Sequence, residues 1–133
     1  MHTTEFQVDT SQRQVVDLTR DVVAFCRGRG DGLVSVFAPH ATVGLALIEV
    51  GSGSEGDLEA ALERLLPRDR PYTHAHGSAG HGADHLLPAL VSPSLVIPVV
   101  GGAPALGSWQ SVVLIDLNRD NPLRRVRLSF VSG

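Results

Sequence analysis

The sequence predicts an α+β fold, mainly an antiparallel β-sheet or sandwich with two or three helices. Segments with strand character outnumber segments with helical spacing, and most connections between them are short. This pattern fits antiparallel pairing better than the regular βαβ alternation of a parallel sheet. The 133 residues show no internal repeat, low-complexity stretch or linker, so we expect a single domain, residues 1–133.

Three segments are predicted as helices. In residues 12–27, Ser11 is the candidate N-cap. Apolar residues follow there at the spacing of one helix face: Val15, Leu18, Val22 and Phe25. Residues 54–66 form the second segment and residues 84–91 the third. The third segment tolerates Pro88 because that residue falls within its first turn.

The predicted strands make up most of the rest of the chain. They are residues 4–8, 33–38, 42–50, 94–100, 109–117 and 124–131. Pro39–His40 separates the second from the third, so these two form either a hairpin or one bent strand. Pro98 indicates a sheet edge or a bulge in the fourth. In the last strand, Val126, Leu128 and Phe130 alternate with polar residues and are expected to face the core.

Composition and charge exclude several classes of protein. The 11 basic residues, all arginine, and the 14 acidic residues give a net charge of −3, which argues against a nucleic-acid partner. The absence of lysine excludes Schiff-base and P-loop chemistry. The single cysteine, Cys26, excludes an intrachain disulfide or a multi-cysteine metal site. With neither a secretory signal nor a membrane-spanning segment, we expect a cytoplasmic protein without a membrane partner.

Histidine is the residue type that points most directly to chemistry. Four of the six histidines fall in one span of twelve residues in an irregular, glycine-rich part of the chain: His74, His76, His81 and His85. Neutral imidazole is the commonest transition-metal ligand and the usual acid–base group near neutral pH. Gly82 makes a continuous helix from His81 to His85 doubtful. The stretch is therefore either part of a functional site or a solvated loop with incidental histidines.

Polar residues inside apolar strands raise a second question. Glu49 and Asp116 each interrupt an apolar run, which is costly unless the carboxylate is paired, belongs to a site or faces water at the strand end. Gln110 and Asp116 share a strand face but are separated by roughly 20 Å at about 3.3 Å per residue. They therefore serve different sites, or a neighbouring subunit closes the gap. Arg64, Arg68 and Arg70 cluster near the histidine-rich stretch, where they either contact phosphate or form a solvated helix end.

Four motifs together resemble one known family over essentially the whole chain. PHATVGLALIE contains His40, Thr42 and Glu49; LLPRDRPYTH contains Pro67, Tyr72 and His74; DHLLPALVSPSLVIPV contains His85 and Pro98; GGAPALGSWQSVVLID contains Gly102, Leu106, Gly107, Trp109, Gln110 and Asp116. The chain resembles the YjbQ-like (UPF0047) family, also called the secondary thiamine-phosphate synthase family. It departs from the family pattern at Ile48, where the family has Asn, and at Asp116, where it has Glu.

The resemblance implies a homotrimer with pockets near its subunit interfaces. It implies a transferase reaction in which a pyrimidine pyrophosphate and a thiazole phosphate give thiamine phosphate and pyrophosphate. The residues it assigns to catalysis are His40, Glu49, His74, His85 and Asp116, and those it assigns to substrate binding are Thr42, Gly107, Trp109 and Gln110. The histidines His40, His74 and His85 are expected to hold a divalent metal, zinc or magnesium, whereas His76 and His81 lie outside the family pattern.

Two other functions fit the same residues. One is a non-catalytic trimeric module that binds a metal or a small anion. The other is a metal-dependent hydrolase of a phosphorylated metabolite. In each enzymatic alternative the expected partner is a small phosphorylated metabolite.

Overall fold

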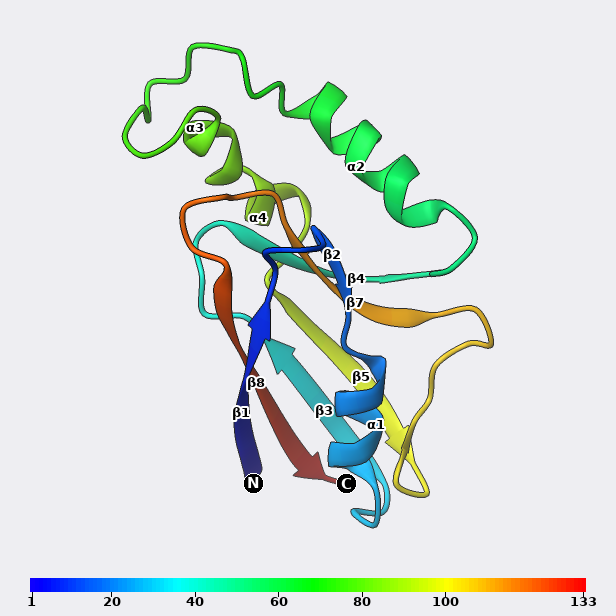
Figure 1. Cartoon of the computed structure of the whole chain (residues 1–133). Helices are drawn as coiled ribbons and strands as arrows, with labels where there is room; N and C mark the ends of the chain where they lie inside the picture. Colours follow the sequence, from blue (N-terminus) through cyan, green and yellow to red (C-terminus); the bar gives the residue numbers. More distant parts are fainter.

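Two antiparallel sheets form the frame of the computed structural model, which describes residues 1–133 (Figure 1). The five-stranded sheet has the order β1-β8-β3-β5-β6, with β1 at His2–Asp9, β8 at Leu123–Ser132, β3 at Gly32–Phe37, β5 at Ser94–Val100 and β6 at Ala103–Pro104. The three-stranded sheet has the order β2-β7-β4, with β2 at Val15–Asp17, β7 at Ser111–Asp116 and β4 at Val43–Ile48. The predicted α+β class with antiparallel sheets is confirmed.

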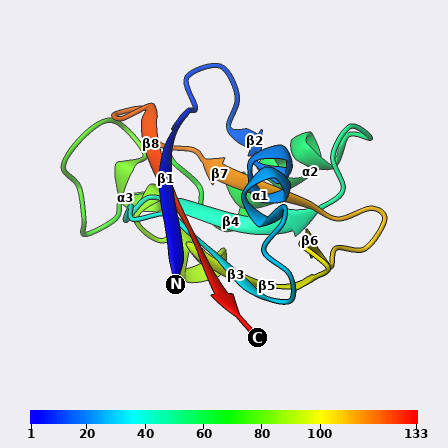
Figure 2. The same ribbon diagram turned by 90° about the horizontal axis from the view of Figure 1, so that it is seen from below.

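The helices are α1 at Thr19–Cys26, α2 at Ser54–Leu65, α3 at His81–Asp84 and α4 at Leu87–Leu90. The third predicted helix, residues 84–91, is shortened to the single turn α4, with Pro88 in its first turn, and α3 is a separate turn that precedes the predicted range except for Asp84. No helix is both long enough and apolar enough to cross a membrane. Both termini lie side by side at one end of the five-stranded sheet (Figures 1 and 2).

The first helix is shorter than predicted. Residues Val15–Asp17 are not its first turn but strand β2, which pairs antiparallel with β7. The open edge of β7 binds this backbone, so tertiary pairing outweighs the helical spacing of Val15 and Leu18. The helix begins after Asp17, whose carboxylate accepts the backbone N–H of Thr19 at 2.9 Å. Ser11 is therefore not a helix cap.

The break predicted at Pro39–His40 separates the two sheets. Strand β3 pairs with β5 and β8, whereas β4 pairs with β7, so β3 and β4 do not form a hairpin. Pro98 lies in β5 opposite Leu33, on a strand flanked on its outer side only by the two-residue β6. The predicted edge holds only for this part of β5, because β6 pairs with Val99 and Val100 and not with Pro98.

The core consists of two clusters that share β7. The larger one, of 16 buried residues, lies between the sheets and α1 and includes Val126, Leu128 and Phe130, as predicted. The smaller one, of 8 buried residues, lies under α2, α3 and α4. Val112 and Leu114 of β7 face the larger cluster, and Val113 and Ile115 face the smaller one. Burial on both faces explains the continuous apolar run that ends at Asp116.

Candidate metal centre

The irregular segment between α2 and α3 is anchored at several points. The Arg68 guanidinium pairs with the buried carboxylate of Asp84 and donates to the Ala79 carbonyl at 3.1 Å. The Tyr72 hydroxyl donates to the Pro67 carbonyl at 2.7 Å. The Arg68–Asp84 pair ties the start of the loop to α3, and the other two bonds fold the loop on itself, so its exposed histidines are brought to a defined place.

Glycine at position 82 allows the loop to approach α3 closely. A Cβ atom at Gly82 would collide with the backbone carbonyl of His74 and the side chain of Tyr72. The backbone N–H of His85 still bonds to the His81 carbonyl at 3.2 Å. His81 and His85 therefore lie one helical turn apart on the same face, and Gly82 does not interrupt their register.

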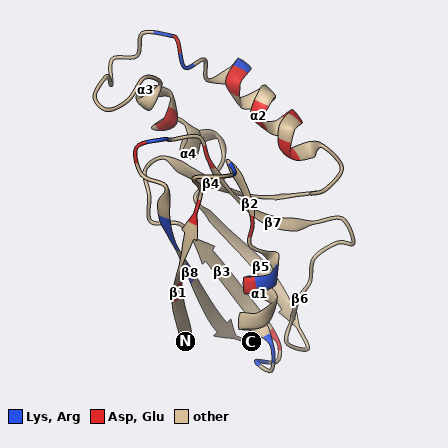
Figure 3. Ribbon diagram, viewed as in Figure 1, with Lys and Arg blue, Asp and Glu red and all other residues tan.

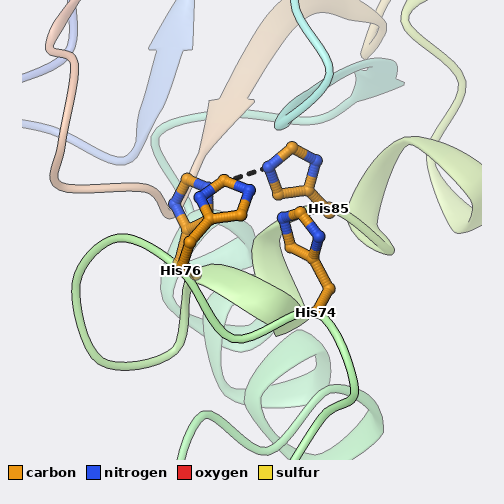
Figure 4. A group of neighbouring side chains, drawn as sticks. His74, His76 and His85 are labelled. Atoms are coloured by element: carbon orange, nitrogen blue, oxygen red, sulfur yellow. Dashed lines mark hydrogen bonds between the residues drawn. The ribbon is translucent and has the colours of Figure 1, made fainter.

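The imidazoles of His74, His76, His81 and His85 converge, and we call them the four-histidine cluster (Figure 4). One ligand atom from each lies within 4.8 Å of the others. The ring centroids of His74 and His76 are 4.0 Å apart, and those of His74 and His85 are 4.2 Å apart. Nε2 of His81 lies 2.9 Å from Nε2 of His85. Two nitrogens at this distance share one proton, and a metal ion can replace that proton.

Two members of the cluster, His74 and His85, are shifted toward the neutral imidazole. Desolvation lowers the pKa of His85 below its ordinary value, and the neighbouring imidazoles of His74 and His81 lower it further. The pKa of His74 is also lowered, by desolvation and by the imidazoles of His76 and His81. Neutral imidazole is the form that binds metals, so the crowding prepares the cluster for a cation.

The chemistry of the donors indicates which metals fit. All four ligand atoms are imidazole nitrogens, and the chain's one thiol, Cys26, is buried in the larger core cluster. Nitrogen sets of this kind suit zinc, copper or nickel, whereas magnesium requires oxygen ligands and retains water. Of the two metals expected from the sequence, the donor set fits zinc.

A cavity of about 460 Å³ adjoins the cluster. Its lining includes three of the histidines together with Arg68, Arg70 and Tyr72. Arg68 is engaged by Asp84, whereas Arg70 is exposed and forms no ion pair. The cavity has the size of a small-molecule site, and Arg70 is the cation free to meet an anionic ligand there.

Of the three predicted metal ligands, the structure brings only His74 and His85 into the cluster. His76 and His81, which the sequence left open, complete it. His40 lies outside the cluster, and its Nε2 accepts the backbone N–H of Arg125 at 2.8 Å. Desolvation and the nearby Arg124 guanidinium lower the pKa of His40.

Thr42 and Asp116 belong to a buried ion-pair network. Arg124 donates to both oxygens of Asp116, at 2.7 and 3.0 Å, and to the Thr42 hydroxyl at 2.9 Å. The Thr10 hydroxyl donates to Asp116 at 2.7 Å. Asp116 is 2% exposed. With both oxygens bonded and no access to solvent, its carboxylate is placed to hold β7 to β8.

The remaining predicted site residues lie at the opposite end of the three-stranded sheet. The register pairs Val43 with Asp116 and Ile48 with Ser111, so Glu49 and Gln110 are far from Asp116. Glu49 is exposed and accepts the Ser52 hydroxyl at 3.1 Å. Gln110 accepts the backbone N–H of Gly107 at 2.8 Å, and Trp109 is 75% exposed. Within one chain the predicted residues therefore occupy three separate places.

Sequence reasoning missed two polar residues beside the cluster, Asn118 and Asp120. Asn118 lies near both Asp84 and His81, and Asp120 lies 2.8 Å from His81. They follow Asp116 at alternate positions after β7, and this spacing of polar residues is the sequence feature that could have identified them. Nothing local to the sequence connects this turn with a histidine some 37 residues earlier.

Comparisons with known proteins agree with the motifs. The family described as UPF0047 protein YjbQ-like matches residues 4–133. UPF0047 protein Rv2556c of Mycobacterium tuberculosis is 63% identical over 133 residues, covering all of both chains. The crystal structure of a hypothetical protein from Aeropyrum pernix superposes with a TM-score of 0.89 at 29% identity, covering all of both chains.

A YbjQ-like protein of unknown function from Sulfolobus solfataricus gives a TM-score of 0.90 at 20% identity, covering 99% of this chain and 97% of that one. At this identity the likeness shows the fold. With the family matched over nearly the whole length and close relatives in sequence, the chain belongs to the UPF0047 YjbQ-like family.

Proposed function

We propose that this protein binds a zinc-type metal ion through His74, His76, His81 and His85 and uses it on a small phosphorylated metabolite. The convergence of four imidazoles to within 4.8 Å carries the proposal. The neighbouring imidazoles help to lower the pKa values of His74 and His85, and such crowding is unfavourable unless something binds between the rings. A divalent cation bound by their nitrogens relieves that crowding.

The cavity beside the cluster supports an anionic substrate. A metal bound here would act as a Lewis acid on a phosphoryl oxygen. The exposed Arg70 lines the same cavity and can bind phosphate oxygens. His74 and His76 are exposed in the loop, whereas His81 and His85 are half-buried on α3, so the loop side of the centre faces substrate.

The same site supports two kinds of reaction. Hydrolysis would release phosphate from a single substrate, and group transfer would release pyrophosphate as a second substrate is joined. The thiamine-phosphate synthase reaction implied by the family resemblance belongs to the second kind and stays a prediction. Assaying phosphate release without a second substrate separates the two.

We also propose self-association as a homotrimer. Neither β3 nor β5 carries a charged residue (Figure 3). The outer face of the five-stranded sheet exposes a row of apolar side chains: Leu33, Phe37, Val96, Val100 and Val131. Val96 and Val100 are 62% and 63% exposed. Glu5 of β1 and Arg127 of β8 pair beside this apolar row, on the β1–β8 part of the same face, so the row has a polar border as at the rim of an interface. A second copy of the chain is the occupant we infer.

The decisive measurement is metal analysis of the purified, untagged protein together with its zinc affinity. We expect near-stoichiometric zinc, and we expect the double variant His81→Ala/His85→Ala to lose it. His2→Ala is the matched control, because His2 is exposed on β1 outside the cluster. A wild-type protein that neither carries nor binds zinc would refute the metal centre. Zinc binding without turnover of any phosphorylated substrate would instead support the non-catalytic module.

A further inference from the structure

The turn after β7 places two polar side chains against one nitrogen of His81. Nδ1 of His81 lies 2.8 Å from Oδ2 of Asp120 and 2.9 Å from Nδ2 of Asn118. The other ring nitrogen, Nε2, faces Nε2 of His85 at 2.9 Å. The proton on the ring can sit at only one of the two nitrogens when the imidazole is neutral. Asn118 and Asp120 therefore influence which ring nitrogen of His81 carries the proton and which keeps the lone pair that can bind a metal.

Asn118 is held in one orientation. Its Oδ1 accepts the backbone N–H of Asp120 at 2.9 Å, and its Nδ2 donates to Oδ2 of Asp84 at 3.0 Å. Its side chain is buried, so no solvent competes for these bonds. The amide thus presents a second N–H toward His81, and this contact favours an unprotonated Nδ1.

Asp120 requires the opposite proton position. An ionised carboxylate only accepts hydrogen bonds, so its contact with His81 needs a proton on Nδ1. The same oxygen accepts the backbone N–H of Ser78 at 3.2 Å, which holds the carboxylate toward the loop. Hydrogen bonds to an ionised partner are roughly twice as strong as neutral ones. The carboxylate therefore outweighs the Asn118 amide, and the lone pair falls on Nε2.

We propose that Asp120 is a positioning residue that holds His81 in the tautomer protonated on Nδ1 and so presents its Nε2 lone pair to the four-histidine cluster. This inference rests on the metal centre proposed above. Histidines that bind metals commonly donate their other ring N–H to a carboxylate, which fixes the tautomer and strengthens the ligand. The bond also joins the turn after β7 to α3, so the sheet contributes to the centre without supplying a ligand.

The test compares Asp120→Ala with Asp69→Ala. Asp69 is exposed and lines the cavity beside the four-histidine cluster. Replacing it by alanine removes one negative charge, as Asp120→Ala does, but leaves the contacts of His81 intact. The first measurement is the tautomer of His81 in the metal-free protein, from two-bond ¹H–¹⁵N correlations of ¹⁵N-histidine-labelled samples. The second is zinc affinity by competition with a chromogenic chelator.

We expect wild-type His81 to carry its proton on Nδ1. In Asp120→Ala the remaining Asn118 contact should move the proton to Nε2, and zinc affinity should fall by about 10- to 100-fold. Asp69→Ala should change neither. The proposal would be overturned if His81 in Asp120→Ala still carried its proton on Nδ1, or if the zinc affinity of this variant were unchanged. A wild-type protein that binds no zinc, with His81 protonated on Nδ1, would refute the metal centre while supporting the Asp120 contact.

Discussion

At the scale of single residues, a polar side chain in an apolar environment can either belong to a functional site or stabilise the fold. Asp116 is bonded by Arg124 and Thr10 on both oxygens and is closed to solvent. Removing the partner of such a buried carboxylate leaves an uncompensated charge, so Asp116 supports the fold through its partners. His85, in contrast, meets other imidazoles and no strong fixed partner, which leaves it available to a ligand.

The lowered pKa values of His74 and His85 determine how zinc binding depends on pH. Protons compete with zinc for imidazole nitrogen, and a lowered pKa means that this competition begins at a lower pH. We expect zinc affinity to be flat through neutral pH and to fall only below the ordinary histidine pKa of about 6.5. Isothermal titration at a series of pH values measures this. Affinity that already falls steeply between pH 8 and 7 would contradict the expected direction.

At the scale of elements, α3 is the part of the fold that creates the centre. It is a helix of only 4 residues, but it aligns His81 with His85 and receives the loop that carries the other two histidines. Its register is maintained by the buried Asp84, which Arg68 and Asn118 both bind. The smaller core cluster beneath it includes Ala83 and Leu87, so hydrophobic burial fixes the helix from below.

Gly82→Ala tests how closely the loop must approach α3. The added Cβ would collide with the His74 carbonyl, which is backbone and cannot rotate away, so His74 and His76 should be displaced. We expect zinc affinity to fall at least about tenfold, as for other changes in the support of metal ligands. Thermal unfolding followed by circular dichroism should show that the fold survives.

Gly56→Ala is the control for Gly82→Ala. A Cβ at Gly56 would meet no atom within 4 Å, and the residue lies inside α2. Alanine there should stabilise the protein by up to about 1 kcal/mol, because glycine is a poor helix former. Equal zinc affinity in Gly82→Ala and Gly56→Ala would show that close approach of the loop is not required.

At the scale of the whole molecule, the proposed homotrimer rests on the apolar outer face of the five-stranded sheet and on the separation of the predicted site residues. The cluster lies at one end of the molecule, whereas Glu49, Trp109 and Gln110 lie at the far end of β7. One chain alone cannot bring these together. Trp109, which is largely exposed, is at the end where a neighbouring copy would have to bind for these residues to share a site.

Val96→Glu tests the proposed homotrimer. A charge at the centre of the outer face should be buried without a partner in the assembly, so the trimer should dissociate to monomers at micromolar concentration. Light scattering after size-exclusion chromatography measures the mass. Leu65→Glu is the control, since Leu65 is 67% exposed on α2, away from this face. A wild-type monomer, or a Val96→Glu trimer, would contradict the proposed interface.

The sequence by itself was sufficient for the class of fold, the family and the region of the centre. Alternation in β8 and the apolar run of β7 are local patterns, and burial reproduces them. The helical spacing of α2 is reproduced only in part, because Leu62 is buried whereas Leu65 is 67% exposed. The family motifs are also local. Four histidines within twelve residues were visible as a candidate site because the chain keeps them near one another whatever its fold.

Only the tertiary structure decided which of those residues meet. Joining His81 to Asp120, or Asp116 to Thr10, requires contacts across 39 and 106 positions, and such contacts depend on how the sheets and loops pack. The same holds for β2, where an open edge of β7 outweighed helical spacing. It also holds for His40, which bonds to β8 and lies outside the four-histidine cluster. Local periodicity reports which face of an element is buried, but partners across the fold are chosen by packing and by the need to satisfy buried polar groups.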